Sequence, residues 1–517
     1  NFIRGRDAYG KLYYEDAEEF LTKAIQLDST FALAHLYLAR TNNALRQYEA
    51  RDAGIEKAKL FAKDIAEKDR MYINASYAGY IEKNPGKRLH ILEQMAERFP
   101  REKYVFMDLG WYYRGRKKYT RAIAEFNRAL ELDPNYAEIY NGLAYTYGDM
   151  KQFDKADECL SSYANLVPGD ANPYDSMAEY YMRTGRIEKA IDKYKEALEV
   201  KPDFGCEKYL GWLYATREDY LAAIKWEEKY VVNTQIPARM ILGNLYQGLF
   251  LYQAGNPQMA LRKTDDAINA ATNFNLKWGV AFYHYFRAWF AMDLGDPEQA
   301  KKSFTLFYDF WVEQRPQYLP NHKADFAFRM GLIYLLQMKT DSARIKLQEM
   351  KTLFPDLTPI SKERNLWCQY FLYTNLLISE DSLKKAVQLK NQKITMERPF
   401  AFNLNYLEYN FPLTQDFLAQ AYIKKGMTGP AIKEYEYLLE TDPFKREHRI
   451  INPRYHYKLA KLYQETGETE KAIEQYSRFL EIWQKADQKL PEYIDSKRQL
   501  AVLKGASYSK SETRNKF

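Results

Sequence analysis

The sequence predicts an all-α fold, a right-handed superhelical solenoid of about 12–13 helix-turn-helix repeats. The first observation is a period of 34 residues across residues 103–204, in which the same residue types return to the same places. The second is the proline that follows each period, at Pro100, Pro134, Pro168 and Pro202. The third is a small residue in both helical patterns of each period. Such a period is typical of stacked helix pairs.

Each period contains two amphipathic helical patterns, a first helix (A) and a second helix (B). Helix A carries a large residue, a small residue and then a tyrosine, as in Leu109-Gly110-Tyr113, Leu143-Ala144-Tyr147 and Met177-Ala178-Tyr181. Helix B carries a central alanine, at Ala122, Ala156 and Ala190. A larger side chain at the crossing would hold the two helices apart. Since one repeat cannot bury its faces alone, at least about three must stack.

The repeats extend in both directions from this regular block. Upstream, the first helix B runs from Glu15 to Leu27, so Asn1 is expected to lie partway into a truncated first helix. Downstream, the spacing between crossing alanines rises from 34 to as much as 45 residues. We expect the added residues in turns or in longer helices. The downstream crossing positions are Ala223, Ala260, Ala300, Ala343, Ala386, Ala431 and Ala472.

These patterns divide the chain into six segments. They are divergent N-terminal repeats (1–102), the regular block (103–236), lengthened repeats (237–390), an irregular insertion (391–414), C-terminal repeats with a capping helix (415–503) and a polar tail (504–517). The insertion holds two prolines and a run of aromatic residues. It is either a loop and extended helix on the solenoid edge or a partner contact. The last helix is expected at Pro491–Leu503, and the tail shows no helical period.

Composition narrows the function classes. The 76 basic and 69 acidic residues give a net charge of +7, and the longest basic block is Arg116-Lys117-Lys118. Nucleic-acid binding, which needs a concentrated basic stripe, is therefore not predicted. The longest apolar run, Met330 to Met338, is too short to cross a bilayer, so no membrane insertion is predicted. Localisation stays open between the cytoplasm and, with a removed N-terminal signal, the periplasm or the extracellular space.

No catalytic, cofactor or metal site is predicted. The three cysteines show no CxxC spacing, and the six histidines form no HExxH pair. The segment from Gly79 to Arg88 comes nearest to a phosphate loop, but its glycines are wrongly spaced and no Ser or Thr follows Lys87. Acidic pairs on amphipathic helices are typical of solvated faces.

The concave face of the solenoid is the candidate binding surface. Aromatic residues alternate there with Asn, Asp, Glu, Arg and Lys, and such a face could hold an extended peptide or, as a second option, a glycan. The alternative is that these side chains simply cover the inner surface. The residues that we predict for the groove are Tyr104, Trp111, Arg114, Asn141, Tyr145, Asp175, Glu179, Arg183, Lys208 and Trp212.

The 34-residue pattern resembles the tetratricopeptide repeat (TPR) family over nearly the whole chain. Residues 67–75 and 171–204 also resemble TPR regions that follow signalling or effector domains in bacterial proteins. The family resemblance implies a protein-binding solenoid. Asp175 and Glu179 do not fit the Lys and Asn pattern of chaperone-binding TPR domains.

Three functional hypotheses follow from this resemblance and from the residues. The first is a non-enzymatic scaffold that contacts a protein or peptide through its groove and ends. The second is a structural subunit whose ends stack on other copies of itself in an envelope or extracellular filament. The third is the sensor portion of a larger bacterial signalling protein.

Overall fold

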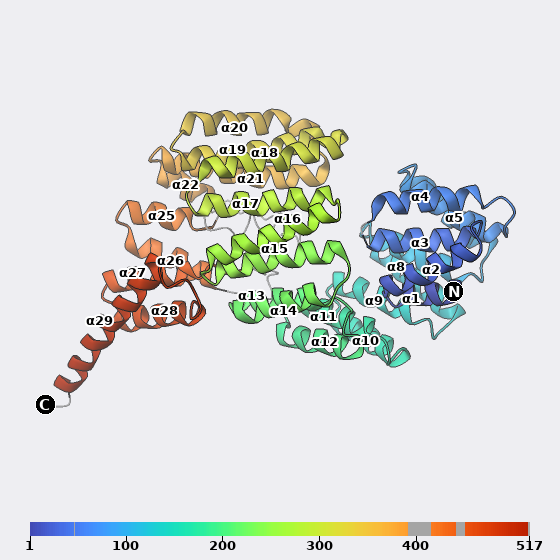
Figure 1. The fold of residues 1–517 in the computed structure, drawn as a ribbon, viewed down its shortest axis with the longest axis horizontal. Coiled ribbons are helices and arrows are strands. Elements are labelled where there is room, and N and C mark those ends of the chain that lie inside the picture. Colours follow the sequence, from blue (N-terminus) through green and yellow to red (C-terminus); the bar gives the residue numbers. More distant parts are fainter. Residues whose placement is uncertain (46, 391–414, 441–449, 515–517) are drawn as a thin grey trace. The chain divides into compact units, whose positions relative to one another are not determined.

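The computed structural model describes residues 1–45, 47–390, 415–440 and 450–514. The predicted insertion at 391–414 lies outside the described residues. The chain forms two compact units: unit 1 comprises residues 1–182 and 188–204, and unit 2 comprises residues 183–187 and 205–517. Every regular element in the described ranges is helical, which confirms the predicted all-α fold (Figure 1).

Unit 1 consists of six helix pairs in which A and B helices alternate. Most of these helices have 12 to 14 residues. Their bounds are α1 Phe2–Gly10, α2 Tyr14–Leu27, α3 Ala32–Ala44, α4 Tyr48–Leu60, α5 Glu67–Tyr80, α6 Pro85–Arg98, α7 Lys103–Arg114, α8 Tyr119–Leu132, α9 Ala137–Asp149, α10 Phe153–Leu166, α11 Asn172–Arg183 and α12 Ile187–Val200.

Unit 2 continues the alternation with longer helices. The 17 residues of α15 and the 21 of α21 confirm that added residues extend the helices. The bounds are α13 Glu207–Thr216, α14 Tyr220–Val232, α15 Pro237–Gln253, α16 Pro257–Asn273, α17 Lys277–Asp293, α18 Pro297–Gln314, η1 Pro316–Tyr318, α19 Leu319–Leu336, α20 Thr340–Leu353, η2 Phe354–Asp356, α21 Pro359–Ser379, α22 Leu383–Lys390, α25 Phe417–Lys424, α26 Thr428–Leu439, α27 Arg454–Glu465, α28 Thr469–Ile482 and α29 Pro491–Arg514.

The alanines predicted at the helix crossings are all completely buried. They are Ala122, Ala156, Ala190, Ala223, Ala260, Ala300, Ala343, Ala386, Ala431 and Ala472. The residue five positions before each alanine adopts a left-handed backbone conformation in the turn between helix A and helix B. These residues are Lys117, Lys151, Gly185, Glu218, Gly255, Gly295, Met338, Asp381, Gly426 and Gly467. This conformation ends helix A and lets helix B fold back against it. The register predicted from the alanines is therefore confirmed.

Large side chains fill the space that the small residues leave. The Phe126 ring is fully buried between Gly110 of α7 and Gly142 of α9. A Cβ atom added at Gly110 would lie 2.4 Å from the ring, and one at Gly142 would lie 2.6 Å from it. Only glycine allows this close approach on both sides. Phe126 therefore locks one repeat onto the next.

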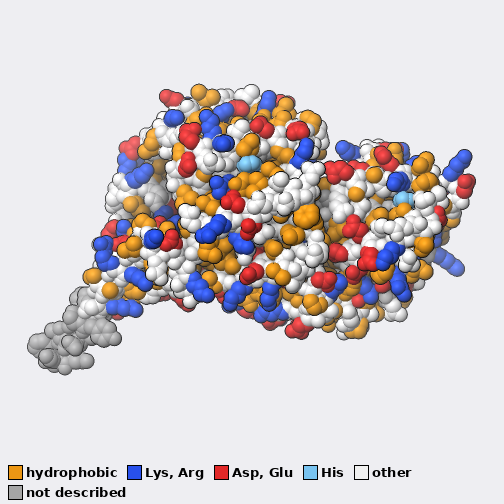
Figure 2. Space-filling model, viewed as in Figure 1, with side chains coloured by type: hydrophobic (Ala, Val, Ile, Leu, Met, Phe, Trp, Pro, Cys, Tyr) orange, Lys and Arg blue, Asp and Glu red, His pale blue; other side chains and the backbone are white. Residues whose placement is uncertain are grey.

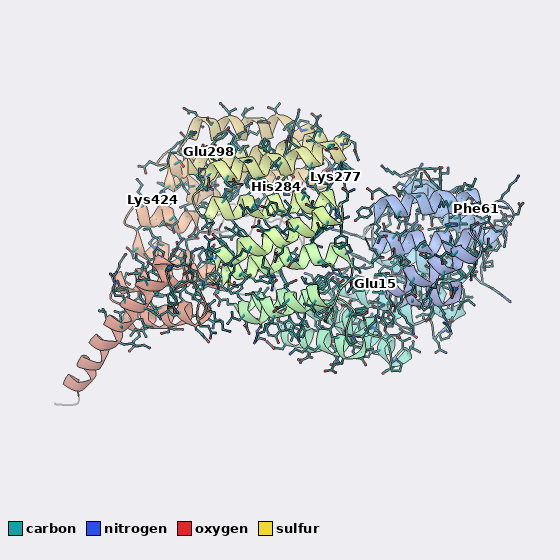
Figure 3. All side chains as sticks on the ribbon, viewed as in Figure 1. Glu15, Phe61, Lys277, His284, Glu298 and Lys424 are labelled. Carbon is teal, nitrogen blue, oxygen red and sulfur yellow. The ribbon has the colours of Figure 1, made fainter. Side chains whose placement is uncertain are left out.

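Several helices begin at a residue whose side chain caps the helix N-terminus. Asn84 and Asp296 accept the backbone N–H three residues on, and a proline follows each of them at the first helical position. Charged residues also suit the helix dipole: Glu298 lies in the first turn of α18 and Lys424 in the last turn of α25 (Figure 3). These local signals set the helix boundaries independently of the core.

Unit 1 closes on itself through contacts between residues far apart in the sequence. Lys11 Nζ lies 3.1 Å from the Asp170 carboxylate, and the Ala171 amide donates to Tyr13 Oη at 3.2 Å. These contacts join the α1–α2 turn to the α10–α11 turn. Lys201 and Phe204, which follow α12, also contact α2 and the α1–α2 turn. We call this set of contacts the edge contact of unit 1. Its residues are Lys11, Tyr13, Asp16, Asp170, Ala171, Lys201 and Phe204.

Unit 2 closes through a more buried set of contacts. Arg454 Nη1 lies 3.0 Å from the Asp293 carboxylate, and its Nε lies 3.1 Å from Glu492. The Trp483 indole N–H donates to the Gln253 carbonyl at 2.9 Å, and Trp483 is 1% exposed. These contacts hold α27 and α28 against α15 and α17.

The last helix departs from the prediction. It was expected to end at Leu503 before a tail without helical structure, but α29 continues to Arg514. The prediction took the loss of apolar periodicity as the end of the helix. Extending an existing helix costs little, because each added residue gains a backbone hydrogen bond, so a polar sequence can continue it.

One core position carries an acid. Glu227 of α14 lies four residues after Ala223, where other repeats carry Phe126, Leu160 or Tyr194. It is completely buried, and neither carboxyl oxygen has a hydrogen-bond partner among the described residues. Burial raises the pKa of the Glu227 carboxyl well above its usual value, with Lys208 lowering it and Glu207 raising it.

We predict that Phe126→Ala lowers the free energy of unfolding of unit 1 by about 3–5 kcal/mol, because it removes a ring packed on both sides and leaves a cavity. Urea denaturation followed by circular dichroism measures the change. Leu132→Ala is the control, since this side chain is 40% exposed. A loss for Phe126→Ala no larger than for the control would contradict the packing argument.

We also predict that Glu227→Gln stabilises unit 2 increasingly as pH rises. Below the unfolded-state pKa of about 4.3, the carboxyl is protonated in both states. Above it, the unfolded state ionises while the folded state keeps its proton, so the wild type loses up to about 1.4 kcal/mol per pH unit until the raised folded pKa is reached. Chemical denaturation between pH 4 and pH 8 measures the trend, with exposed Glu228→Gln as control. A pH-independent difference would refute it.

Candidate binding surface

Four of the predicted groove residues meet in unit 1. Arg114 of α7 lies over the rings of Trp111, at 5.5 Å, and of Tyr145 on α9, at 5.1 Å. Its Nη2 lies 2.9 Å from the Asp149 carboxylate. Tyr145 Oη donates to Glu179 of α11 at 2.6 Å. Three successive A helices thus build one cluster, which we call the groove cluster: Trp111, Arg114, Tyr145, Asp149 and Glu179.

The groove cluster is fixed before any ligand binds. Arg114 and Asp149 are 19% and 23% exposed, so the pair is partly shielded from water. Burial raises the pKa of the Tyr145 phenol well above its usual value, and the negative charge and hydrogen bond of Glu179 raise it further. The hydroxyl therefore stays protonated and keeps donating. Charged and aromatic side chains held in this way are suited to recognition without rearrangement.

Hydrogen-bonding capacity remains open beside this cluster. Arg114 Nε and Asn141 Oδ1 are both buried atoms without a partner among the described residues. One is a donor and the other is an acceptor. Buried polar atoms are normally paired, so these two atoms are exceptions in the neighbourhood of the groove cluster.

A second polar group lies on the preceding A helices. The Arg40 guanidinium of α3 lies over Tyr37, at 5.4 Å, and over Tyr72 of α5, at 5.7 Å. It lies 3.8 Å from the Asp108 carboxylate of α7. The Tyr72 hydroxyl is buried and has no partner among the described residues. The prediction did not include this group, although Arg40 follows Leu38-Ala39 at the same spacing as Trp111 follows Leu109-Gly110.

The first helix pair lies close to the A helices that carry these two groups. Burial raises the pKa of the Tyr9 phenol of α1, and Arg40 and Asp108 are among the charges that act on it. Burial also raises the pKa of the Tyr14 phenol of α2, and Asp175 of α11 adds to the rise. The Tyr9 ring lies 6.0 Å from the Tyr37 ring of α3, and a Cβ atom added at Gly10 would lie 3.2 Å from Glu138 Oε1 of α9. Glu15 follows Tyr14 in the first turn of α2 (Figure 3).

The remaining predicted residues fall in different places. Tyr104 packs edge-on against Tyr136 at 5.5 Å in unit 1. Lys208 lies in unit 2, where its Nζ lies over the ring of Tyr209 at 4.8 Å. Arg183 ends α11 but belongs to unit 2. The groove prediction therefore spans two units.

The prediction that Trp212 lines the groove is wrong. It is 1% exposed and packs against Tyr246, at 6.1 Å, and Phe250, at 6.2 Å, in the core of unit 2. It therefore presents no surface to a ligand. The repeat register gave the right position on helix A, but the longer α15 brings large aromatic side chains against it.

Neither the surface charge nor the placement of possible metal ligands indicates a second binding site among the described residues. Lys and Arg are interspersed with Asp and Glu on the face seen in Figure 2. A search of the described residues finds no group of three or more His, Cys, Asp or Glu side chains placed to hold a metal ion. The same residues include no helix that is long and apolar enough to span a bilayer.

Family comparisons agree with the repeat register. A TPR repeat model matches residues 112–151, and tetratricopeptide repeat models match residues 176–237 and 453–482. The first match contains most of the groove cluster, and the last lies in the C-terminal repeats. The chain is a tetratricopeptide repeat protein. Its fold is the all-α solenoid of that family.

Curated relatives of this TPR protein match it over limited stretches. Human Tetratricopeptide repeat protein 13 is 25% identical over 30% of this chain, and BBSome complex member BBS4 of Bos taurus is 34% identical over 17% of it. Anaphase-promoting complex subunit CDC16 of Saccharomyces cerevisiae is 23% identical over 32%. The chain spans 18%, 16% and 21% of the lengths of these three relatives.

Solved structures match this TPR protein in part. A thermophilic TPR protein of Thermus thermophilus is 22% identical, with a TM-score of 0.29, and the match covers 33% of this chain and 92% of that one. Pseudomonas aeruginosa pilF is 18% identical, with a TM-score of 0.31, and the match covers 41% of this chain and 92% of that one.

Proposed function

We propose that this TPR protein is a non-enzymatic scaffold that binds an extended segment of a protein partner on the concave face of unit 1. The observation that carries the proposal is the groove cluster, in which an ion pair and a hydrogen bond hold charged and aromatic side chains of three successive A helices together. The family matches support protein binding in general terms, since stacked repeats of this kind form extended interaction surfaces.

The chemistry of the surface favours a polypeptide ligand. Each peptide unit carries one N–H and one C=O, which complement the partly exposed Asp149 carboxylate and Arg114 guanidinium. The Trp111 and Tyr145 rings lie next to each other, 6.4 Å apart, with the Arg114 guanidinium close to both. Aromatic and Arg side chains are the residue types that dominate binding energy at protein interfaces. An extended segment can use all four residues at once, because they lie on neighbouring A helices.

We predict that peptides selected on the whole chain from a phage-displayed library of unstructured peptides depend on this cluster. Trp111→Ala and Arg114→Ala should each weaken the selected peptides by about tenfold or more, the range expected for interface hot spots. Fluorescence polarisation with labelled peptides measures the affinities.

Arg116→Ala is the matched control. Arg116 lies in the turn after α7, is exposed and stacks on the ring of Tyr112. It should bind like the wild type. Unchanged binding by Arg114→Ala, or no enrichment of peptides, would overturn the groove assignment. Sedimentation of the unliganded chain over a concentration series tests the filament hypothesis separately, since end-to-end stacking predicts growing assemblies.

A further inference from the structure

We propose that the edge contact of unit 1 is a latch that controls access of a ligand to the groove cluster. The inference rests on the proposed function for its ligand and on the geometry of unit 1 for its mechanism. The latch consists of the α1–α2 turn held against residues that lie far later in the chain, with Tyr13 and Ala171 in direct contact. Its opening would move α1 and α2 away from the concave face.

Each ion pair of the latch joins a partly exposed side chain to a more shielded one. Lys11 and Asp170 are 36% and 13% exposed at a separation of 3.1 Å. Lys201 and Asp16 are 20% and 44% exposed at 3.3 Å. Ion pairs with this exposure are weak and are screened by salt. The electrostatic part of the latch is therefore easily opened.

One aromatic side chain lies at the centre of the latch. Tyr13 packs edge-on against Phe204 at 6.1 Å, and the Lys201 ammonium lies over its ring at 4.7 Å. Its hydroxyl accepts a hydrogen bond from Ala171. Since these contacts share one residue, they form and break together. The latch is thus expected to have two states, closed and open.

The first helix pair lies against an A helix of the groove cluster. A Cβ atom added at Gly10, the last residue of α1, would lie 3.2 Å from Glu138 Oε1 in the first turn of α9. The same helix carries Tyr145 and Asp149 of the groove cluster, and Tyr145 donates a hydrogen bond to Glu179 of α11. A peptide that follows the A helices from α7 to α11 would therefore meet the first helix pair at α9.

Charge reversal tests the latch without a ligand. Lys11→Glu and Asp170→Lys should each increase hydrogen exchange of residues 2–27, and hydroxyl-radical labelling of Trp111 and Tyr145, by about threefold to fivefold, the range of a surface ion pair. The double variant should return both readouts towards the wild type, because it restores the attraction in reverse. Added NaCl at about 0.5 M should open the wild type and reduce the difference between variants.

Lys23→Glu is the control, because Lys23 pairs with Glu19 of its own helix, α2, and not with another described residue of the latch. It should leave both readouts unchanged. The latch proposal would be overturned if hydrogen exchange were equal in the wild type and the single variants. It would also be overturned if exchange and labelling rose further in the double variant. In the same variants, the selected peptides should associate faster with single reversals than with the wild type. Increased labelling without faster association would show that the first helix pair opens, and would overturn the proposal that this opening controls peptide binding.

Discussion

Every repeat of this protein depends on one steric constraint, the close approach of two helices at a small residue. Ten crossing alanines are fully buried, and a large residue usually follows each of them by one helical turn. The Phe126 ring between two glycines shows how little room the crossing leaves. Because this constraint concerns only two faces of each helix, the other faces are free to vary without cost to the solenoid.

The constraint is local, so it does not decide how each unit is closed. Unit 2 is closed by Arg454 and Asp293, which are 17% and 12% exposed, and by the fully buried Trp483. Removing one partner of such a shielded pair is costly, because the other charge stays buried. Unit 1 is closed by more exposed ion pairs around Tyr13. The same repeat architecture thus contains one firm closure and one that water and salt can weaken.

The sequence was sufficient to predict the helix pairs, their register and the lengthening of the later repeats, because these follow from the crossing alanine and its spacing. It also placed Trp111, Arg114, Tyr145 and Glu179 on neighbouring A helices, where these side chains contact one another; that they line a binding groove stays a prediction. Trp212 was assigned wrongly, since its burial depends on the aromatic residues of a longer neighbouring helix. The Arg40–Asp108 group was missed because it joins repeats that the sequence marks only weakly.

The positions free of the crossing constraint are where binding specificity can reside. In unit 1 such positions carry Arg40, Trp111 and Tyr145, with charged partners and open hydrogen-bonding atoms around them. In unit 2 the corresponding Trp212 packs into an aromatic core. The surface proposed for ligand recognition therefore belongs to unit 1. The weaker closure belongs to the same unit, so the surface best suited to recognition also has the contact best suited to regulate it.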